Sequence, residues 1–404
     1  MTALQKRPDS QVAHLTPAQI DEIGRELDAL RERVFTSLGE RDAAYIRRVI
    51  DVHRKLELGS RALLIAGRFP GAWLLGTIGL SVAKILDNME IGHNVLHGQW
   101  DWMRDPKIHS TTWDWDHASP PELWQRAHNQ RHHTYTNILG KDNDLGYGIM
   151  RVDEDQPWQP RHLFQPVQNF VTACIFEYGI AMFDLDLGDH LREGKGLTPS
   201  LRDDLNATLN KVRKQATKDY VVHPLLSGYG WRRTLAANAI ANVVRNLWSH
   251  SVIMCGHFPE GVETFELEKI DPDESRGAWY LRQMLGSANI RGSKLMHLMS
   301  GNLSHQIEHH IFPDLPSNRY AEISREIQDL FKRYGLRYHS APMVKQVASA
   351  WHKVFRLSLP NGWLAETTWK NSPQQLKRLG RMVLSSRKQA LAPAPALKAL
   401  PAAG

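Results

Sequence analysis

The pattern of apolar and polar residues along the chain predicts a mostly helical protein. Apolar residues recur at helical spacing from residue 20 to residue 30, directly after a capping box at Thr16 and Gln19 with a proline at the first helical position. A second, charged helix is expected from Arg41 to about Leu58. We expect the first helix to dock on a surface rather than to span a membrane.

Three longer apolar stretches raise the question of a membrane. They cover residues 62–86, 170–187 and 235–258. A span needs about 20 mostly apolar residues, yet the stretches contain charged residues such as Lys84, Glu177 and Arg245. The cations Arg54 and Lys55, just before the first stretch, are typical of the cytoplasmic flank of a span. Hydropathy alone therefore favours a membrane and a soluble architecture about equally.

Polar segments separate these stretches and close the chain. Residues 101–148 are rich in Trp, His, Asp and Gly, and residues 259–276 are polar and acidic, so both are expected outside any membrane. The tail begins with a capping box at Ser372 and continues as a basic amphipathic helix, for which a bilayer surface and solvent are about equally expected. Residues 392–404 are rich in Ala and Pro, which predicts disorder.

Composition narrows the classes of function. Lys and Arg number 50 against 43 Asp and Glu, and the net charge of +7 suits an anionic membrane surface, a CoA thioester, an acidic redox partner or nucleic acid. The two cysteines, Cys174 and Cys255, lie far apart in apolar stretches, so we expect neither a disulfide framework nor a thiolate metal site. The first thirty residues lack the apolar region of a signal peptide. A reducing, cytoplasm-facing catalytic part is the simpler interpretation.

Eight of the 20 histidines fall into three clusters. They are His93 and His97; His128, His132 and His133; and His305, His309 and His310. The last two clusters share the spacing H-x-x-x-H-H. Positions four apart project from one face of a helix, so each such pair offers two imidazoles to one metal, and the adjacent third histidine can reach a second metal. The pattern predicts a binuclear metal site.

Ligand type narrows the choice of metal. Imidazole suits Fe, Cu, Zn and Ni, and the scarcity of Cys excludes iron–sulfur clusters and thiolate zinc. The H-E-x-x-H pair of zinc proteases is missing, and the carboxylate motifs of soluble di-iron bundles are not evident. A histidine-rich site favours iron that binds dioxygen. Asp142, Asp144 and Glu308 are candidates to orient ligand imidazoles through the other ring nitrogen; equally, Asp142 and Asp144 could cap a turn in residues 140–146.

At these residues the chain resembles the membrane fatty-acid desaturase family. The resemblance rests on His93-Asn-Val-Leu-His97 and on residues 124–137 and 301–313, and it covers roughly residues 12–360. Bacterial stearoyl-CoA (Δ9) desaturases fit best, because residues 14–16 and 39–48 are also similar to theirs. The third box is taken to begin at His305 rather than at the glutamine of front-end desaturases. No cytochrome b5 domain is expected.

The resemblance implies an all-α, integral-membrane four-helix transmembrane bundle with a cytosolic helical cap that holds a histidine-rich di-iron site. We expect three parts, which are N-terminal amphipathic helices in residues 1–58, a membrane desaturase domain in residues 59–360, and a basic helix with a disordered tail in residues 361–404. The implied location is the cytoplasmic membrane, with membrane lipid around the protein and the cap facing the cytoplasm.

The resemblance also implies a ninth histidine ligand, because the family commonly uses nine. We expect it on the apolar helix of residues 235–258, where His250 and His257 compete. His250 follows Asn246 by four residues, and the amide of Asn246 could hold a metal-bound water. We favour His257, because Gly256-His257-Phe258-Pro259 closes the helix where the cap should begin. His250 with Asn246 is the alternative.

The function implied by the resemblance is O2-dependent desaturation. Two iron ions and dioxygen would remove two hydrogens from adjacent methylenes of a long-chain saturated acyl chain and leave a cis double bond. The substrate is expected to be a fatty acyl-CoA, or else a phospholipid-bound acyl chain. Since no dinucleotide fingerprint such as G-x-G-x-x-G is visible, the electrons should come from a ferredoxin-like or flavoprotein reductase that uses NADPH.

Two alternatives remain open. A membrane di-iron fatty acyl hydroxylase or alkane monooxygenase would carry the same histidine boxes, which do not separate oxygen insertion from desaturation. The other alternative is a histidine-rich metal-binding or nucleic-acid-binding protein. Nucleic-acid binding would need basic clusters interleaved with exposed aromatics, whereas the aromatics here lie beside the boxes and in apolar runs. We expect no nucleic-acid partner.

Overall fold

The computed structural model describes residues 10–366 and 372–391, apart from residues 143, 188, 189, 191–193 and 195. The predicted disordered tail, residues 392–404, lies outside them. In the first half of the chain the helices, with short 3-10 and π segments marked η, are α1 (Pro17–Thr36), α2 (Glu40–Ile65), α3 (Pro70–Leu86), η2 (Asp87–His93), α4 (Asn94–Leu96), η3 (Asp101–Met103), α5 (Pro121–Trp124), η4 (Gln125–His132), α6 (His133–Tyr135), η5 (Gly146–Gly148), η6 (Pro160–Phe164), α7 (Gln165–Cys174) and α8 (Phe176–Phe183).

In the second half they are α10 (Pro199–Thr217), η7 (Lys218–Val222), α11 (His223–Leu226), η8 (Gly228–Gly230), α12 (Trp231–His257), η9 (Leu267–Lys269), α13 (Arg276–Leu285), α14 (Lys294–Met299), η10 (Leu303–His305), α15 (Gln306–Ile311), η11 (Ser317–Arg319), α16 (Tyr320–Arg333), α17 (Met343–Ser358), α18 (Trp363–Glu366) and α19 (Ser372–Leu391). Two parallel strand pairs, β1 (Ile138–Leu139) with β2 (Phe265–Glu266) and β3 (Asn289–Arg291) with β4 (Ser340–Pro342), join distant segments. The three-part division stays a prediction, although α2 runs across its first boundary.

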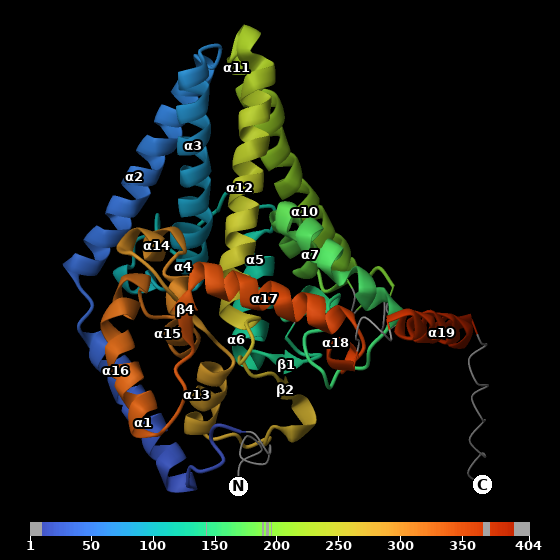
Figure 1. Ribbon diagram of the computed structural model, residues 1–404. Coiled ribbons are helices and arrows are strands. Elements are labelled where there is room, and N and C mark those ends of the chain that lie inside the picture. The colour runs from blue at the N-terminus through green and yellow to red at the C-terminus, as the bar shows by residue number, and fades with distance from the viewer. Residues whose placement is uncertain are drawn as a thin grey trace, which may run out of the picture.

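The molecule has a narrow helical arm and a broader body (Figure 1). In the arm, α3 packs between α2 and α12, and α11 packs on α12 near the far end. The body contains α1, α13, α15, α16 and α17. The junction of arm and body is where α3 continues into η2 and where α12 ends at His257.

The N-terminal helix docks on the body of the protein itself. Thr16 and Gln19 form the predicted capping box, in which the Gln19 N–H donates to Thr16 Oγ1 at 3.3 Å and the Thr16 N–H donates to Gln19 Oε1 at 2.8 Å. The apolar face of α1 is buried against α13 and α16. A Cβ at Gly277 would lie 1.9 Å from Ile20 O, so only glycine allows this close approach of α13 to α1.

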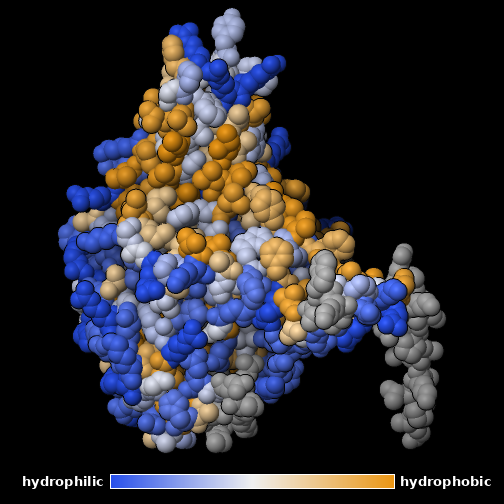
Figure 2. Space-filling view, viewed as in Figure 1, coloured by the Kyte–Doolittle hydropathy of each residue, from blue (hydrophilic) through white to orange (hydrophobic). Residues whose placement is uncertain are grey.

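The predicted four-helix transmembrane bundle is wrong, because none of the helices in the described part of the chain is both long and apolar enough to cross a membrane. Helix α3 has 17 residues, short of the roughly 20 that a span needs. Helix α12 has 27 residues, but Asn242, Arg245 and Asn246 interrupt its apolar sequence and are buried. Apolar side chains such as Leu74, Ile78 and Val243 lie exposed on the arm, where Figure 2 shows hydrophobic patches.

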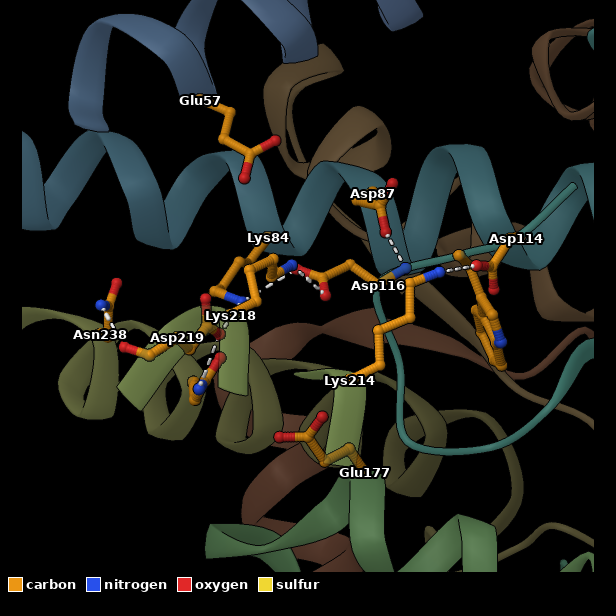
Figure 3. A network of polar contacts seen from close by, with 12 residues as sticks. Glu57, Lys84, Asp87, Asp114, Asp116, Glu177, Lys214, Lys218, Asp219 and Asn238 are labelled. Atoms are coloured by element: carbon orange, nitrogen blue, oxygen red, sulfur yellow. Dashed lines mark hydrogen bonds and ion pairs between the residues drawn. The ribbon is translucent and has the colours of Figure 1, made fainter. Parts of the chain in front are cut away.

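A buried charge network holds the 101–120 segment against the arm (Figure 3). Lys84 of α3 donates to Asp116 Oδ2 at 2.9 Å and to Asp219 Oδ2 at 2.7 Å, and its side chain is 3% exposed. Arg61 and Lys218 complete the pairing, at 3.1 Å from Asp219 and 2.6 Å from Asp116. Burial opposes the charge on Lys84, but the two carboxylates raise its pKa above the ordinary value. The network fixes the chain that leads into the second histidine box.

Candidate metal centre

Two of the three histidine boxes lie on π-helical segments. His93 ends η2, and His128 and His132 lie in η4. A π turn changes the angular position of each side chain relative to an α-helix and is frequent at functional sites. The predicted regular α-helical geometry is therefore wrong for these two segments.

Eight of the nine predicted histidine ligands converge in three overlapping groups. Within each group the ligand atoms lie within 4.8 Å of one another. The groups are His93, His97, His128 and His309; His128, His132 and His133; and His132, His257 and His310. Three sequence boxes and the end of α12 therefore meet in one place, as a binuclear site requires.

His305 is the predicted ligand that these groups do not include. Its backbone, at φ −103° and ψ 55°, precedes the first residue of α15, so it does not share a helical face with His309. The His305 ring stacks on His297 instead, with ring centroids 4.7 Å apart.

The neighbouring residue Gln306 takes the place expected of His305. Gln306 Nε2 lies 3.0 Å from His257 Nε2, and a Cβ at Gly256 would lie 2.9 Å from Gln306 Cδ. Sequence reasoning missed this residue. The signal was available, because Gln306, His309 and His310 have the i, i+3, i+4 spacing of one helical face.

The geometry favours His257 over His250 as the histidine that α12 contributes. His257 Nε2 lies 3.1 Å from His310 Nε2. His250 Nε2 lies 3.0 Å from the amide oxygen of Asn169, outside the three groups. Asn246 is also occupied elsewhere, since its amide nitrogen donates to Cys174 O at 3.0 Å and its oxygen accepts from Arg245.

Two carboxylates hold the second ring nitrogen of metal-site histidines. Asp144 Oδ2 lies 2.8 Å from His128 Nδ1, and Asp142 Oδ1 lies 2.9 Å from His132 Nδ1. Asp142 also caps the local turn, because its carboxylate accepts from the backbone N–H groups of Asn137 and Asp144. Both interpretations of these aspartates therefore describe the structure. The Glu308 carboxylate instead accepts hydrogen bonds from the side chains of Asn289, in β3, and Tyr338, just before β4. These bonds hold the strand pair against α15.

Further orienting partners are Asn94, inside the first box, and Tyr320 and Gln283, outside the boxes. Tyr320 Oη lies 3.2 Å from His309 Nδ1, Gln283 Oε1 lies 3.2 Å from His310 Nδ1, and Asn94 Oδ1 lies 3.0 Å from His93 Nδ1. A partner at Nδ1 leaves the lone pair of Nε2 free to face a metal. Because Tyr320 and Gln283 lie outside the boxes, sequence spacing gave no signal for them.

Burial makes most of these imidazoles neutral. It lowers the pKa of His93 and His257 to about 4, and it lowers the pKa values of the remaining buried members, apart from His132, well below the ordinary value. His132 differs, since burial opposes its charge but Asp142 and Asp144 raise its pKa to about 9. Neutral imidazole is the form that binds a metal.

Unpaired ring nitrogens are the evidence that the residues fit a metal. His97 Nε2, His128 Nε2, His309 Nε2 and both nitrogens of His133 are buried without a hydrogen-bond partner among the described residues. Buried polar atoms are normally paired, and each unpaired one carries a free-energy cost. Several lone pairs that converge within 4.8 Å form a donor set for metal ions.

A small, largely apolar cavity adjoins this donor set. Its volume is about 40 Å³. The lining residues are Asn88, Met89, His93, Trp115, His117, Trp124, His128, Asp144, Tyr147, Phe176, Ile180, Asp184, Ile253 and Leu303. Trp124 stacks on His128 with ring centroids 4.5 Å apart, so the aromatic wall touches the metal-site imidazoles directly.

Comparisons with known proteins give the family and the relatives that the chain is similar to. Residues 69–342 match the family model described as fatty acid desaturase. The chain is 48% identical over 359 residues to an NADPH-dependent stearoyl-CoA 9-desaturase of Mycobacterium tuberculosis, with 88% of this chain and 83% of the relative covered. It is 27% identical over 285 residues to an sn-1 linoleoyl-lipid 6-desaturase of Synechocystis, with 67% and 76% covered. No solved structure matches the chain.

Proposed function

The chain belongs to the fatty acid desaturase family, and on that premise we propose that it introduces a cis double bond at the Δ9 position of a long-chain saturated acyl-CoA. As a member of this family it is an oxidoreductase that acts on acyl chains. The observation that carries the proposal is the 48% identity, over 88% of this chain, to a relative named as a stearoyl-CoA 9-desaturase.

The donor set suits two iron ions. His93, His97, His128 and His309 would hold one, and His132, His257 and His310 would hold the other, with His133 in contact with both sets. When bound, the irons supply the reduction of dioxygen and the removal of two hydrogens from adjacent methylenes. Burial favours the neutral form of these imidazoles apart from His132, and Asp142, Asp144, Tyr320 and Gln283 orient four of them.

The reacting methylenes would lie beside the apolar wall of this cavity. That wall includes Trp115, Trp124, Phe176 and Leu303, whose side chains offer apolar surface. If the acyl chain binds with one methylene pair beside the metal-site histidines, the reacting atoms are already in position for the reaction. The surrounding apolar side chains exclude water. This arrangement supports chemistry on an unactivated hydrocarbon chain.

Electrons must come from a partner. The relative is named as NADPH-dependent, and we propose that an NADPH-linked donor, a ferredoxin-like protein or a flavoprotein reductase, reduces this chain as well. The location at the cytoplasmic membrane, with the catalytic part facing the cytoplasm, stays a prediction. Cell fractionation followed by immunodetection tests it.

Product analysis tests the proposed function. The purified, iron-loaded protein is supplied with stearoyl-CoA, an NADPH-linked donor and oxygen, and the released fatty acids are analysed by mass spectrometry. We expect a C18 acid with one cis double bond at carbon 9. A hydroxylated acid would indicate oxygen insertion instead, and an unchanged acid in the presence of bound iron would contradict the proposal. A phospholipid substrate in parallel separates the two acyl carriers.

A further inference from the structure

One short segment supplies both carboxylates of the metal centre and then a tyrosine in a strained backbone conformation. Three residues after Asp144, Tyr147 has φ 52° and ψ 30°, in the left-handed region that bulky residues rarely adopt. Gly146 and Gly148 on either side also have positive φ, of 73° and 63°. Strain of this kind persists only where surrounding contacts impose it, and it is frequent at functional sites.

Aromatic packing imposes the conformation of Tyr147. Its ring lies 5.8 Å from Phe176 and 5.4 Å from Phe183, measured between ring centroids, and the residue is 1% exposed. Phe258 lies on the ring at 6.3 Å with an interplanar angle of 24°. A Cβ at Gly146 would lie 2.5 Å from Val152 Cγ1, so the backbone before Tyr147 has little freedom to move.

The hydroxyl of Tyr147 has no hydrogen-bond partner among the described residues. A buried hydroxyl that has lost water without gaining a partner is costly, and phenylalanine would fill the same space without that cost. Packing therefore explains the aromatic ring and leaves the oxygen unexplained. An unpaired buried group of this kind indicates a ligand that binds there during function.

The cavity shows where such a ligand would lie. Tyr147 lines the cavity together with His93 and His128. Two other polar lining residues are already engaged, since Asn88 Oδ1 accepts from Ser249 at 2.8 Å and Asp184 accepts from Ser119. Among the buried polar atoms of the described lining residues, Tyr147 Oη and His128 Nε2 have no partner. The cavity, at about 40 Å³, has room for water-sized molecules, each of which needs about 10–15 Å³.

We propose that Tyr147 is a positioning residue whose hydroxyl donates a hydrogen bond to an oxygen atom held in this cavity beside His128, either of dioxygen as it is reduced or of the water that forms. The proposal rests on the proposed function, because dioxygen is the co-substrate of desaturation. A fixed hydrogen-bond donor stabilises developing negative charge most strongly in a site that is closed to water. It keeps the reduced oxygen at the metal centre and limits its escape as hydrogen peroxide.

Tyr147→Phe tests the proposal, because it removes the oxygen and keeps the ring. Tyr280→Phe is the matched control, since Tyr280 is also fully buried but its hydroxyl donates to Asp28 at 2.7 Å, far from the cavity. Both full-length variants are loaded with iron and assayed with stearoyl-CoA and an NADPH-linked donor. For Tyr147→Phe we expect hydrogen peroxide released per NADPH consumed to rise by about tenfold or more, with KM for stearoyl-CoA within about twofold of the wild type. Tyr280→Phe should leave the peroxide yield unchanged.

A second measurement separates positioning from packing. The Tm of metal-free Tyr147→Phe should equal or exceed that of the wild type, because a costly unpaired hydroxyl is removed, whereas the Tm of Tyr280→Phe should fall. Unchanged peroxide yield in Tyr147→Phe, or a Tm that falls as in the control, would overturn the proposal. If the wild type makes no double bond, the proposed function fails, while peroxide release with NADPH and the Tm values still report on Tyr147.

Discussion

At the scale of single residues, the metal-site imidazoles differ in the group that holds their second nitrogen. Asp142 and Asp144 give two of them a carboxylate partner, whereas Tyr320 and Gln283 give two others a neutral partner. Spacing indicated eight candidate histidines, of which His305 lies outside the three groups, whereas His257 was expected only from the family resemblance. Their neutral partners could not be found, because Tyr320 and Gln283 reach the site through tertiary packing rather than through a local motif.

Because Asp142 pairs with His132, the stability of the metal-free protein should depend on pH. The pKa of His132 is about 9 in the folded state, above its ordinary value of 6.5, so the charged pair stabilises the fold fully below pH 6.5 and loses this contribution as the pH rises through 9. Asp142→Asn should therefore reduce the free energy of unfolding at pH 6, by at most about 3 kcal/mol because Asp144 still pairs with His132. Urea unfolding at pH 6 and at pH 9.5 measures the difference between wild type and variant. An equal difference at both pH values would contradict the pairing.

The choice between the two histidines of α12 predicts a difference in metal content. His257→Ala should lose iron and nearly all desaturation, because His257 lies within the third ligand group. His250→Ala is the control, since its ring contacts Asn169 instead, and it should keep its iron. Elemental analysis of the purified variants measures the iron content. Iron loss in the control and retention in His257→Ala would move the ligand to His250 and Asn246.

At the scale of elements, sequence reasoning located several helices but not their arrangement. The capping box at Thr16 fixes the start of α1, and α12 ends at the predicted His257. The predicted common face of His305 and His309 does not exist, because α15 begins only at Gln306. A local pattern determines where a helix can start, but it does not determine which residue of a box remains outside the helix.

The buried charge network around Lys84 should contribute to the stability of the arm. Asp219→Ala would leave Lys84, which is 3% exposed, with one carboxylate fewer and would also remove a partner from Arg61. Removal of one partner from a buried pair costs about 3–5 kcal/mol, so we expect a loss of that size in denaturant unfolding. Asp51→Ala is the control, because its pair with Lys55 is exposed and should change stability by less than about 1 kcal/mol. Equal effects of the two variants would show that the network contributes little.

At the scale of the whole molecule, the metal centre lies where distant parts of the chain meet. Histidines near residues 93, 130, 257 and 309 converge there, so a bound metal would join the arm to the body. The transmembrane bundle was expected from the family resemblance and is wrong, because none of the described helices is long and apolar enough to cross a membrane. The buried Arg245 of α12 pairs with Glu177 inside the molecule. Pairing of this kind across 68 residues of sequence is not visible in a local pattern.

Metal removal should therefore destabilise the whole fold. A metal present at a thousand times its Kd stabilises the folded state by about 4 kcal/mol, which in a chain of 404 residues corresponds to a Tm decrease of about 5 °C after chelation. Differential scanning fluorimetry with and without a chelator measures the shift, and added ferrous iron should reverse it. A Tm that is insensitive to chelation would contradict a role of these histidines in metal binding.

The π-helical segment that carries the second box limits which changes of length the chain tolerates. Deletion of one residue from Gln125–His132 would allow a regular α-helix, in which His132 would follow His128 by three residues instead of four and its ring would take a different position relative to His128. Gln130 is exposed, so Gln130→Ala should keep iron, whereas deletion of Gln130 should abolish iron binding. Elemental analysis of the two proteins compares them directly. The exposed Gln130 can be replaced, but a gain or loss of one residue there would change the spacing between the two halves of the box.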